Sequence, residues 1–519
     1  FSRHMNRLIG GPLPLDGAAV KKEMLGVVYP LAPSYITVEP GMFYRDFEKI
    51  TLAKGLILPC YTASKSLNAV GGMYGNNSAG ERTLKYGKTE NYILESKVVF
   101  GDGNEYIVRP LSQAGLEKKI AQGDYEGEIY KKIYNLIKEN KEELKQAKPK
   151  VSKNSAGYYI WNVMDSENKE NSWSLFHPSD GSGRLENSPY YPSQAENYFD
   201  LNKLLVGSQG TLGIVTEITF RIIPDLKHNK LVAIFLKDLS PLGRLVEEIR
   251  ALNPETLETY DDKTMKLAVR FFFDFLKNKG FIGMMKFMLS FLPEAFIMAT
   301  GGFPKLIILA EFAGGNEAEV QAKCEALEKK IEHFKLKVHI TRNQTESNKY
   351  WDIRRESFAL LRKHVSGKHT APFIDDIIVR PEFLPKFLPE LKTILNQYKI
   401  TFTIAGHAGD GNFHIIPLMD FKRSDTPKII LELGEKVYDL VAKYRGSITA
   451  EHNDGLIRTP YLNKMYQTHI LSLFKDIKNI FDPKNILNPG KKVAFANQAG
   501  TIDYISKHIA REHKAVHKV

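Results

Sequence analysis

Apolar and polar positions alternate over several short segments in the first part of the chain. The runs 36–38, 41–44 and 97–99 are β-like, and the last one ends in a Gly-Asp-Gly turn. A longer strand pattern covers 213–223, and residues 125–146 carry apolar side chains at helical spacing. These patterns predict a domain of short strands with one long helix.

A different pattern begins near Leu231. It repeats a strand, a helix and a strand, first over 305–312, 316–334 and 336–341 and again over 374–380, 382–397 and 401–406. Such a repeat predicts a second domain whose sheet carries helices on one face. The fold class expected for the whole chain is therefore α+β.

Two stretches fit neither pattern. Residues 150–200 are rich in Ser, Asn, Gly and Pro, which predicts a long loop or insertion. Residues 265–300 combine Phe and Met with Lys. They predict either a basic amphipathic helix on a membrane surface or a core or lid segment over a substrate site.

Composition narrows the class of protein. The chain has 519 residues, 43% of them hydrophobic, which is enough for two or three domains. Its net charge of +12 comes without the basic-aromatic stripe typical of nucleic-acid binding, so no nucleic-acid partner is expected. Cys60 and Cys324 are the two cysteines, too few for a disulfide framework or an iron–sulfur cluster. We therefore expect a reducing, cytoplasmic compartment.

His407 and His414 flank a glycine-rich turn. The runs 401–406 and 413–418 on either side are apolar and β-rich, which predicts a hairpin. Facing Cβ atoms on paired strands lie roughly 5 Å apart, so both imidazoles could share one metal ion. A third protein ligand would leave positions open for substrate. A hairpin with two incidental histidines is the alternative.

A second polar cluster follows a short strand pattern near residue 450. Glu451 and His452 stand together, ahead of Asn453, Asp454 and Gly455. Glu451 could complete a set of two histidines and a carboxylate, and His452 could act as an acid–base group. A solvated Glu-His pair on a loop is the alternative.

Two glycine-rich segments stand earlier in the chain. The first reads Val-Gly-Gly at 70–72 and Asn-Ser-Ala-Gly at 77–80, followed by Tyr-Gly at 86–87. The second covers 207–216 and contains three glycines. Glycine lets the backbone approach a flat ligand closely and adopt positive φ. Ordinary tight turns are the alternative for either segment alone.

These motifs, with Phe-Asp-Pro at 481–483 and Leu-Asn-Pro-Gly-Lys at 487–491, resemble the FAD-linked D-2-hydroxy-acid dehydrogenases. That family includes D-lactate dehydrogenases, D-2-hydroxyglutarate dehydrogenases and glycolate oxidase flavin subunits, all with the vanillyl-alcohol-oxidase flavin fold. The resemblance covers roughly residues 1–495, and five motifs in the family's order make it specific.

The resemblance implies a domain plan. A PCMH-type FAD-binding domain is expected at 1–225 and an α+β cap domain with an antiparallel sheet at 226–447. Residues 448–495 are expected to return to the flavin domain, and 496–519 form a tail.

It also implies the site residues. FAD is expected to contact Gly71, Gly72, Asn77, Ser78, Ala79, Gly80, Tyr86, Gly87, Gly207, Gly210, Gly213, Ile214, Val215 and Asn488. A divalent metal, Zn²⁺ or Mn²⁺ on ligand type, is expected on His407, His414 and Glu451, with His452 as the catalytic base.

The substrate is expected to be a small 2-hydroxy acid. Arg354 falls at the family's carboxylate-binding position, with Arg355 or a plain helix salt bridge as alternatives. Ile374 and Ile416 stand where hydroxyglutarate-type members carry Lys and Asn. This difference favours a smaller or more apolar acid, D-lactate before D-2-hydroxyglutarate or glycolate.

The family also has a Gly-x-Gly-Thr-Ser loop for the FAD pyrophosphate, upstream of the segment that corresponds to Phe1–Arg7. We therefore expect the N-terminal part of the flavin domain to be missing and FAD to bind weakly or not at all. A metal-independent relative on the same fold and a flavin-free, non-catalytic subunit are the two rival interpretations.

Electrons must also leave the flavin. With no cluster cysteines in the sequence, the expected acceptor is a quinone, a cytochrome or a separate iron–sulfur protein. Some members of the family are peripheral membrane enzymes, so contact with the inner face of the plasma membrane is a further expectation.

Overall fold

The computed structural model describes residues 8–10, 34–165, 198–270, 303–364, 368–495, 500, 502–503 and 506–507. The chain forms two compact units. Unit 1 comprises 1–149, 154–225 and 451–502, and unit 2 comprises 150–153, 226–450 and 503–519.

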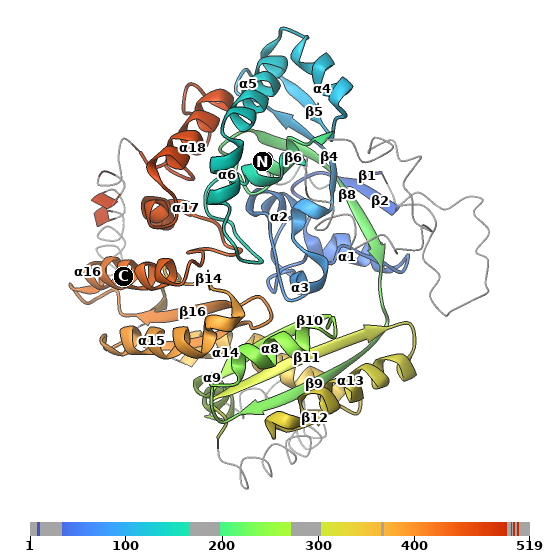
Figure 1. The fold of residues 1–519 in the computed structure, drawn as a ribbon, viewed down its shortest axis with the longest axis vertical. Helices are drawn as coiled ribbons and strands as arrows, with labels where there is room; N and C mark the ends of the chain where they lie inside the picture. The colour runs from blue at the N-terminus through green and yellow to red at the C-terminus, as the bar shows by residue number, and fades with distance from the viewer. Residues whose placement is uncertain are drawn as a thin grey trace. The chain divides into compact units, whose positions relative to one another are not determined.

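Unit 1 consists of a β-sheet and several helices (Figure 1). Its strands are β1 (Leu8–Gly10), β2 (Ser34–Val38), β3 (Leu56–Ile57), β4 (Ile93–Val99), β5 (Glu105–Val108), β6 (Met164–Asp165), β7 (Tyr198–Phe199) and β8 (Ile214–Pro224). Its α-helices are α1 (Tyr44–Leu52), α2 (Val70–Asn76), α3 (Thr83–Tyr86), α4 (Gln113–Ile120), α5 (Tyr125–Glu139), α6 (Lys141–Ala147), α7 (Asn202–Leu205), α17 (Gly455–Arg458) and α18 (Thr468–Phe481).

Strand β8 is the centre of unit 1. The sheet order is β1-β2-β8-β4-β5, and β8 also pairs with β3. All of these pairings are antiparallel. Phe220 on β8 is fully buried and makes an edge-to-face contact with Phe47 of α1, with 5.9 Å between the ring centroids. This contact fixes α1 against the sheet.

Two local predictions for unit 1 are wrong. Residues 41–44 do not form a strand, because Tyr44 already begins α1 and its hydroxyl donates to the carbonyl of Leu58 at 2.7 Å. The single helix expected over 125–146 is divided at Asn140 into α5 and α6. The Asn140 side chain donates to the Leu136 carbonyl at 2.8 Å, a local bond that competes with helix continuation.

Unit 2 is built on an antiparallel sheet of eight strands in the order β12-β9-β11-β10-β15-β16-β13, with β14 paired to β16. The strands are β9 (His228–Leu236), β10 (Thr256–Asp261), β11 (Leu306–Gly314), β12 (Lys337–Ile340), β13 (His369–Thr370), β14 (Ile377–Ile378), β15 (Thr401–His407) and β16 (Asn412–Met419). The described α-helices are α8 (Leu242–Arg250), α9 (Asp262–Arg270), α13 (Glu317–Ile331), α14 (Gln344–His364), α15 (Leu384–Asn396) and α16 (Thr426–Lys443).

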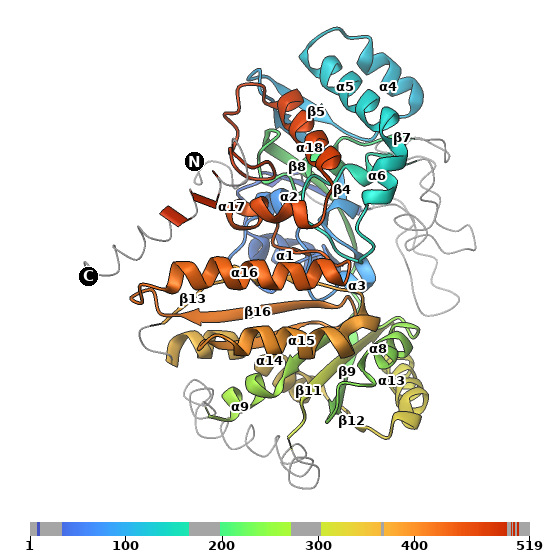
Figure 2. The ribbon, with the colours of Figure 1, turned by 60° about the vertical axis from the view of Figure 1, so that its left-hand side comes forward.

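Helices cover both faces of the sheet in unit 2, so the expectation of helices on one face is wrong. All nine residues of β11 are buried, which requires cover on both sides. One core cluster joins β9, β10 and β11 to α9 and α14 through Tyr260, Met265 and Trp351. Helices α8, α13, α15 and α16 form a second layer; α16 runs alongside β16 in Figure 2.

Other predictions for unit 2 differ in detail. The strand expected over 374–380 is reduced to Ile377–Ile378, because Asp376 has a φ of 75° that breaks the extended backbone. Most of the apolar stretch 265–300 and of the loop 150–200 lies outside the described residues, so their interpretation stays a prediction. Among the helices that the structure describes, none combines the length and apolarity needed to cross a membrane.

Candidate flavin pocket and metal-ligand residues

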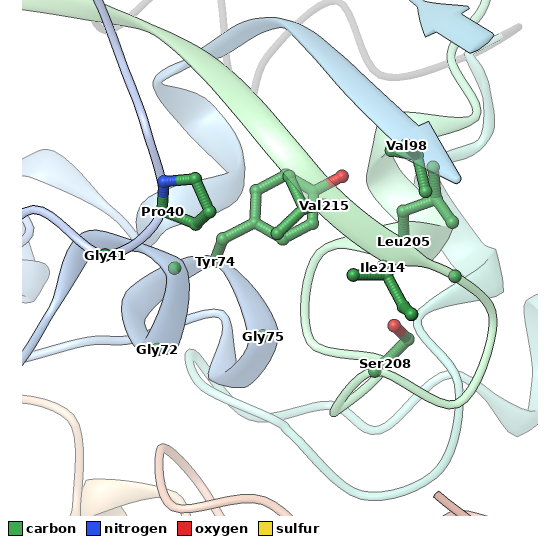
Figure 3. Close-up of a pocket in the computed structure, with 13 residues that line it drawn as sticks. Pro40, Gly41, Gly72, Tyr74, Gly75, Val98, Leu205, Ser208, Ile214 and Val215 are labelled. Carbon is green, nitrogen blue, oxygen red and sulfur yellow. The ribbon is translucent and has the colours of Figure 1, made fainter. Parts of the chain in front are cut away.

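A pocket of about 430 Å³ opens in unit 1 between α2 and the start of β8. Six of the predicted flavin residues line it: Gly71, Gly72, Gly210, Gly213, Ile214 and Val215. Sequence reasoning missed its other lining residues, Pro40, Gly41, Tyr74, Gly75, Val98, Leu205 and Ser208. Figure 3 shows Gly72 and Gly75 of α2 on one side and Ser208 and Ile214 on the other.

Glycines shape this pocket in two ways. A Cβ atom on Gly71 would come within 2.5 Å of Pro40, and one on Gly213 within 2.5 Å of Val98, so the fold itself requires these glycines. Gly72 and Gly75 are different, because a Cβ atom on either would meet nothing within 4 Å.

The fold does not need glycine at these two helix positions. Gly in a helix costs about 1 kcal/mol relative to Ala. Their missing side chains leave open space along one wall of the pocket. A wall without side chains suits a flat ligand such as an isoalloxazine ring.

The remaining predicted flavin residues are not among those that line the pocket. They are Asn77, Ser78, Ala79, Gly80, Tyr86, Gly87, Gly207 and Asn488. The Asn77 amide donates to Glu90 at 2.6 Å and its oxygen accepts from the Glu90 N–H at 3.0 Å. A Cβ on Gly80 would lie 2.0 Å from the Tyr61 carbonyl, and Gly87 has a φ of 73°. Asn77, Gly80 and Gly87 therefore have structural reasons of their own, and contact of all eight residues with FAD stays a prediction.

The second glycine segment is held by residues from the C-terminal part of the chain. The buried Lys478 ammonium donates to the carbonyl of Thr211 at 2.8 Å and to Asp482 at 2.5 Å. Asn488 donates to the carbonyl of Gln209 at 2.7 Å. Residues 478–488 therefore support the segment that forms the pocket wall.

The residue that follows the predicted base is bonded to the two segments that form this pocket. His452 is exposed and precedes Asn453, which has a φ of 70°. The Asn453 amide donates to the carbonyl of Asn76, at the end of α2, and to the carbonyl of Gly207. Glu451 is buried, and its ligand atom lies within 4.8 Å of that of His452. Within unit 1, the Glu-His pair is thus tied to both glycine segments.

In unit 2, His407 and His414 lie on paired strands, as the hairpin prediction required. The ring centroids are 5.3 Å apart and the ring planes are nearly perpendicular. Nδ1 of His414 contacts Asp375 at 3.0 Å, and Nδ1 of His407 contacts Glu258. A carboxylate on Nδ1 orients an imidazole so that Nε2 is the nitrogen able to bind a metal, which is the usual arrangement of metal-bound histidines.

Glu258 also pairs with the predicted substrate arginine. Its Oε2 lies 3.1 Å from Nη2 of Arg354, and its side chain is 1% exposed. Burial raises the pKa of this carboxyl, but His407 and Arg354 together bring it below the usual value. The Arg354 Nε is buried and, among the described residues, has no hydrogen-bond partner. The Arg355 guanidinium instead stacks over the Trp351 ring.

Asp376 links the histidine hairpin to the residues before Glu451. Its carboxylate accepts from Asn412 at 3.1 Å, from the Thr449 hydroxyl at 2.8 Å and from the Ala450 N–H at 2.9 Å. Its ligand oxygen lies within 4.8 Å of that of His414. Sequence reasoning missed Asp375 and Asp376 because both fell within an expected strand.

The metal set expected from the sequence is divided between the units. His407 and His414 belong to unit 2, and Glu451 belongs to unit 1. Their convergence on one ion stays a prediction.

Unit 1 contains a glycine-walled pocket, and unit 2 contains two histidines that are each held by a carboxylate. Both features are consistent with a flavin-dependent oxidoreductase. The family model "FAD linked oxidases, C-terminal domain" matches residues 226–492, and the model "FAD binding domain" matches 19–108. The first match covers more than half of the chain. The chain therefore belongs to the FAD-linked oxidase family, which confirms the resemblance drawn from its motifs.

Three relatives are informative. The chain is 25% identical over 464 residues to D-2-hydroxyglutarate dehydrogenase of Pseudomonas putida, with 88% of the chain but 41% of that protein covered. It is 26% identical over 494 residues to glycolate oxidase subunit GlcD of Bacillus subtilis, covering 94% of the chain and 82% of the relative. D-lactate dehydrogenase of Archaeoglobus fulgidus is 24% identical over 489 residues, with 94% and 84% covered. The chain thus spans about two-fifths of the first of these proteins.

Solved structures confirm the expected fold. The structure of p-cresol methylhydroxylase with substrate bound matches with a TM-score of 0.55 and 14% identity. The match covers 95% of this chain and 79% of that one. The fold is therefore of the PCMH type, with the mixed helical and antiparallel content that the sequence predicted.

Proposed function

We propose that the chain is an FAD-dependent dehydrogenase that oxidises a D-2-hydroxy acid, in the first place D-lactate, to the 2-keto acid. The observation that carries the proposal is that Asn453, the residue after His452, is bonded to both glycine segments that form the pocket. Asn453 bonds to both glycine segments, at 3.2 Å to Asn76 and 3.0 Å to Gly207. A base held beside a flavin site is what removal of a hydroxyl proton during oxidation needs.

Each polar residue has a role in this proposal. His452 takes the hydroxyl proton of the substrate. Arg354 binds its carboxylate, and its buried Nε, which has no partner within the described part of the chain, is a fitting donor. FAD, when bound, supplies the hydride acceptor at its N5 atom.

The donor set fits a divalent cation. Nδ1 of His407 contacts the Glu258 carboxylate, and Nδ1 of His414 contacts the Asp375 carboxylate. Ala450, the residue before Glu451, donates its N–H to Asp376. His407, His414 and Glu451 would hold Zn²⁺ or Mn²⁺. The ion, when bound, lowers the pKa of a coordinated hydroxyl.

The substrate class follows from the surroundings of His414. Ile416 is half-buried and lies two residues further along β16, so its side chain shares the face of His414. An apolar residue there favours a substrate with a short aliphatic side chain over one with a second carboxylate. Ile374 is fully buried.

D-2-hydroxyglutarate is the second candidate, because the relative from Pseudomonas putida carries that name. Glycolate is a third, on the name of the relative from Bacillus subtilis. A flavin-free, non-catalytic subunit would leave the bare wall at Gly72 and Gly75 without a ligand. We propose a quinone, a cytochrome or a separate iron–sulfur protein as the electron acceptor.

The test is a substrate panel on the purified chain after incubation with FAD. D-lactate, L-lactate, D-2-hydroxyglutarate and glycolate are compared with an artificial electron acceptor, before and after chelation and metal addition. The proposal predicts the highest kcat/KM for D-lactate, loss on chelation and recovery with Zn²⁺ or Mn²⁺. Equal activity with D- and L-lactate, or activity that chelation leaves unchanged, would contradict it.

A further inference from the structure

Glu258 occupies a place on the sheet where an apolar side chain would be expected. It pairs in register with Leu309 of β11, and its neighbours on this face belong to the cluster of Leu231, Tyr260 and Trp351. Burying an ionised carboxylate costs several kcal/mol before its partners are counted. A carboxylate at 1% exposure among these residues therefore calls for a reason other than packing.

The strand register places Glu258 beside His407. β10 and β15 are antiparallel, with Thr259 opposite Gly406 and Tyr260 opposite Ala405, so the next pair is Glu258 and His407. Oε1 of Glu258 contacts His407 Nδ1, and Oε2 contacts Arg354 Nη2 at 3.1 Å. The two oxygens are thus divided between a proposed metal ligand and the proposed substrate arginine.

We infer that Glu258 is a positioning residue that orients His407 and Arg354 with a single carboxylate. By accepting from Nδ1, it fixes the tautomer that presents Nε2 as ligand and makes the imidazole a stronger donor. By accepting from Arg354, it restricts a long side chain to one arrangement before the substrate arrives. The metal site and the carboxylate site are thereby set by one side chain. This inference rests on the proposed function.

The chain offers a matched control. His339 and Glu346 form a second His–Glu pair in unit 2, with Nε2 2.8 Å from Oε1, and they belong to β12 and α14 away from the hairpin. Glu346→Gln removes the same charge from the same kind of pair. A general effect of breaking a His–Glu pair would appear in both variants, whereas a positioning role would appear only in Glu258→Gln.

The experiment titrates the metal-depleted full chain with Co²⁺ and follows the visible absorption of the bound ion. Loss of a carboxylate on a metal-bound histidine lowers metal affinity about 10- to 100-fold. We expect this loss for Glu258→Gln, with a rise in KM for D-lactate, both measured under conditions where circular dichroism shows the variant to be folded. Glu346→Gln should bind Co²⁺ like the original chain.

Three results would overturn the inference. If Glu258→Gln binds Co²⁺ as tightly as the original chain and has the same KM, Glu258 has no positioning role, and the proposed function is unaffected. An equal loss in Glu346→Gln would make the effect a general one. Failure of the original chain to bind Co²⁺ would contradict the proposed metal site and the inference together. If Glu258→Gln does not fold, Glu258→Asp decides, since the shorter side chain should also weaken Co²⁺ binding and unchanged binding refutes the role.

Discussion

The side chain of Asn453 donates a hydrogen bond to the backbone carbonyl of Gly207 at 3.0 Å. The same amide donates to the carbonyl of Asn76 at 3.2 Å, so one residue joins the two segments that form the flavin pocket. Because Asn453 follows His452 directly, these two hydrogen bonds also restrict the position of the proposed base. The arrangement would couple the position of the proposed base to that of a bound flavin.

Removing this amide should slow catalysis without releasing FAD. Asn453→Gly keeps a residue that tolerates the φ of 70° and deletes both hydrogen bonds. Two such bonds contribute together about 1–3 kcal/mol, so kcat should fall about 5- to 150-fold while bound FAD stays constant. Asn485, exposed with a φ of 49°, provides the control Asn485→Gly. An unchanged kcat in Asn453→Gly would show that this tie does not place the base.

Filling the bare wall of the pocket should remove FAD from a stable protein. Gly72 is exposed and helical, so Gly72→Leu should leave stability unchanged or raise it by up to about 0.8 kcal/mol from helix propensity. The new side chain would occupy the space left for the ring. Flavin content and the thermal midpoint are measured on the same samples. Full FAD content in Gly72→Leu would mean that the flavin lies elsewhere.

Lys153 should be important for the stability of unit 2. Its ammonium is fully buried 3.0 Å from Asp410, in the turn between His407 and His414. Lys153→Met leaves a buried, unpaired carboxylate, which costs about 3–5 kcal/mol. Lys150→Met, at an exposed position in the same segment, should change stability by less than about 0.5 kcal/mol. Denaturant unfolding compares the two, and equal midpoints would contradict the role of the ion pair.

Ile416 should determine which acid is preferred. Ile416→Arg places a cation on the face of His414, where it can pair with a second carboxylate. A hydrogen bond to a charged group contributes about 1.5–3 kcal/mol, so the kcat/KM ratio of D-2-hydroxyglutarate to D-lactate should rise about tenfold or more. Thr401→Arg, exposed on β15, is the control. A constant ratio would place the substrate side chain away from Ile416.

Much of this site could be predicted from local sequence patterns. The hairpin of His407 and His414 follows from two apolar runs around a glycine turn, and the structure pairs Ala405 with His414 as that pattern requires. Glycines at 71–72 and 210–213 were recognisable because their spacing is local. Each of these features depends on residues close together in the chain.

The supporting residues could not be found in the same way. Glu258 lies 149 positions before His407, and Asn453 lies 246 positions after Gly207. The pairing of distant strands and the packing of the C-terminal segment on unit 1 bring such residues together. Neither can be recognised from the periodicity of a short stretch of sequence. The position of Asp376 could not be predicted for another reason. The pattern at 374–380 predicts one continuous strand, but the positive φ of Asp376 interrupts it.

A D-2-hydroxy acid should reduce the flavin held by this chain. Rapid anaerobic mixing of the FAD-loaded chain with D-lactate, without any electron acceptor, tests it in a single half-reaction. D-lactate should bleach the visible flavin absorbance while L-lactate should not, and His452→Ala should slow the bleaching by at least about 100-fold. A flavin that dithionite bleaches but that D-lactate, D-2-hydroxyglutarate and glycolate all leave oxidised would contradict it.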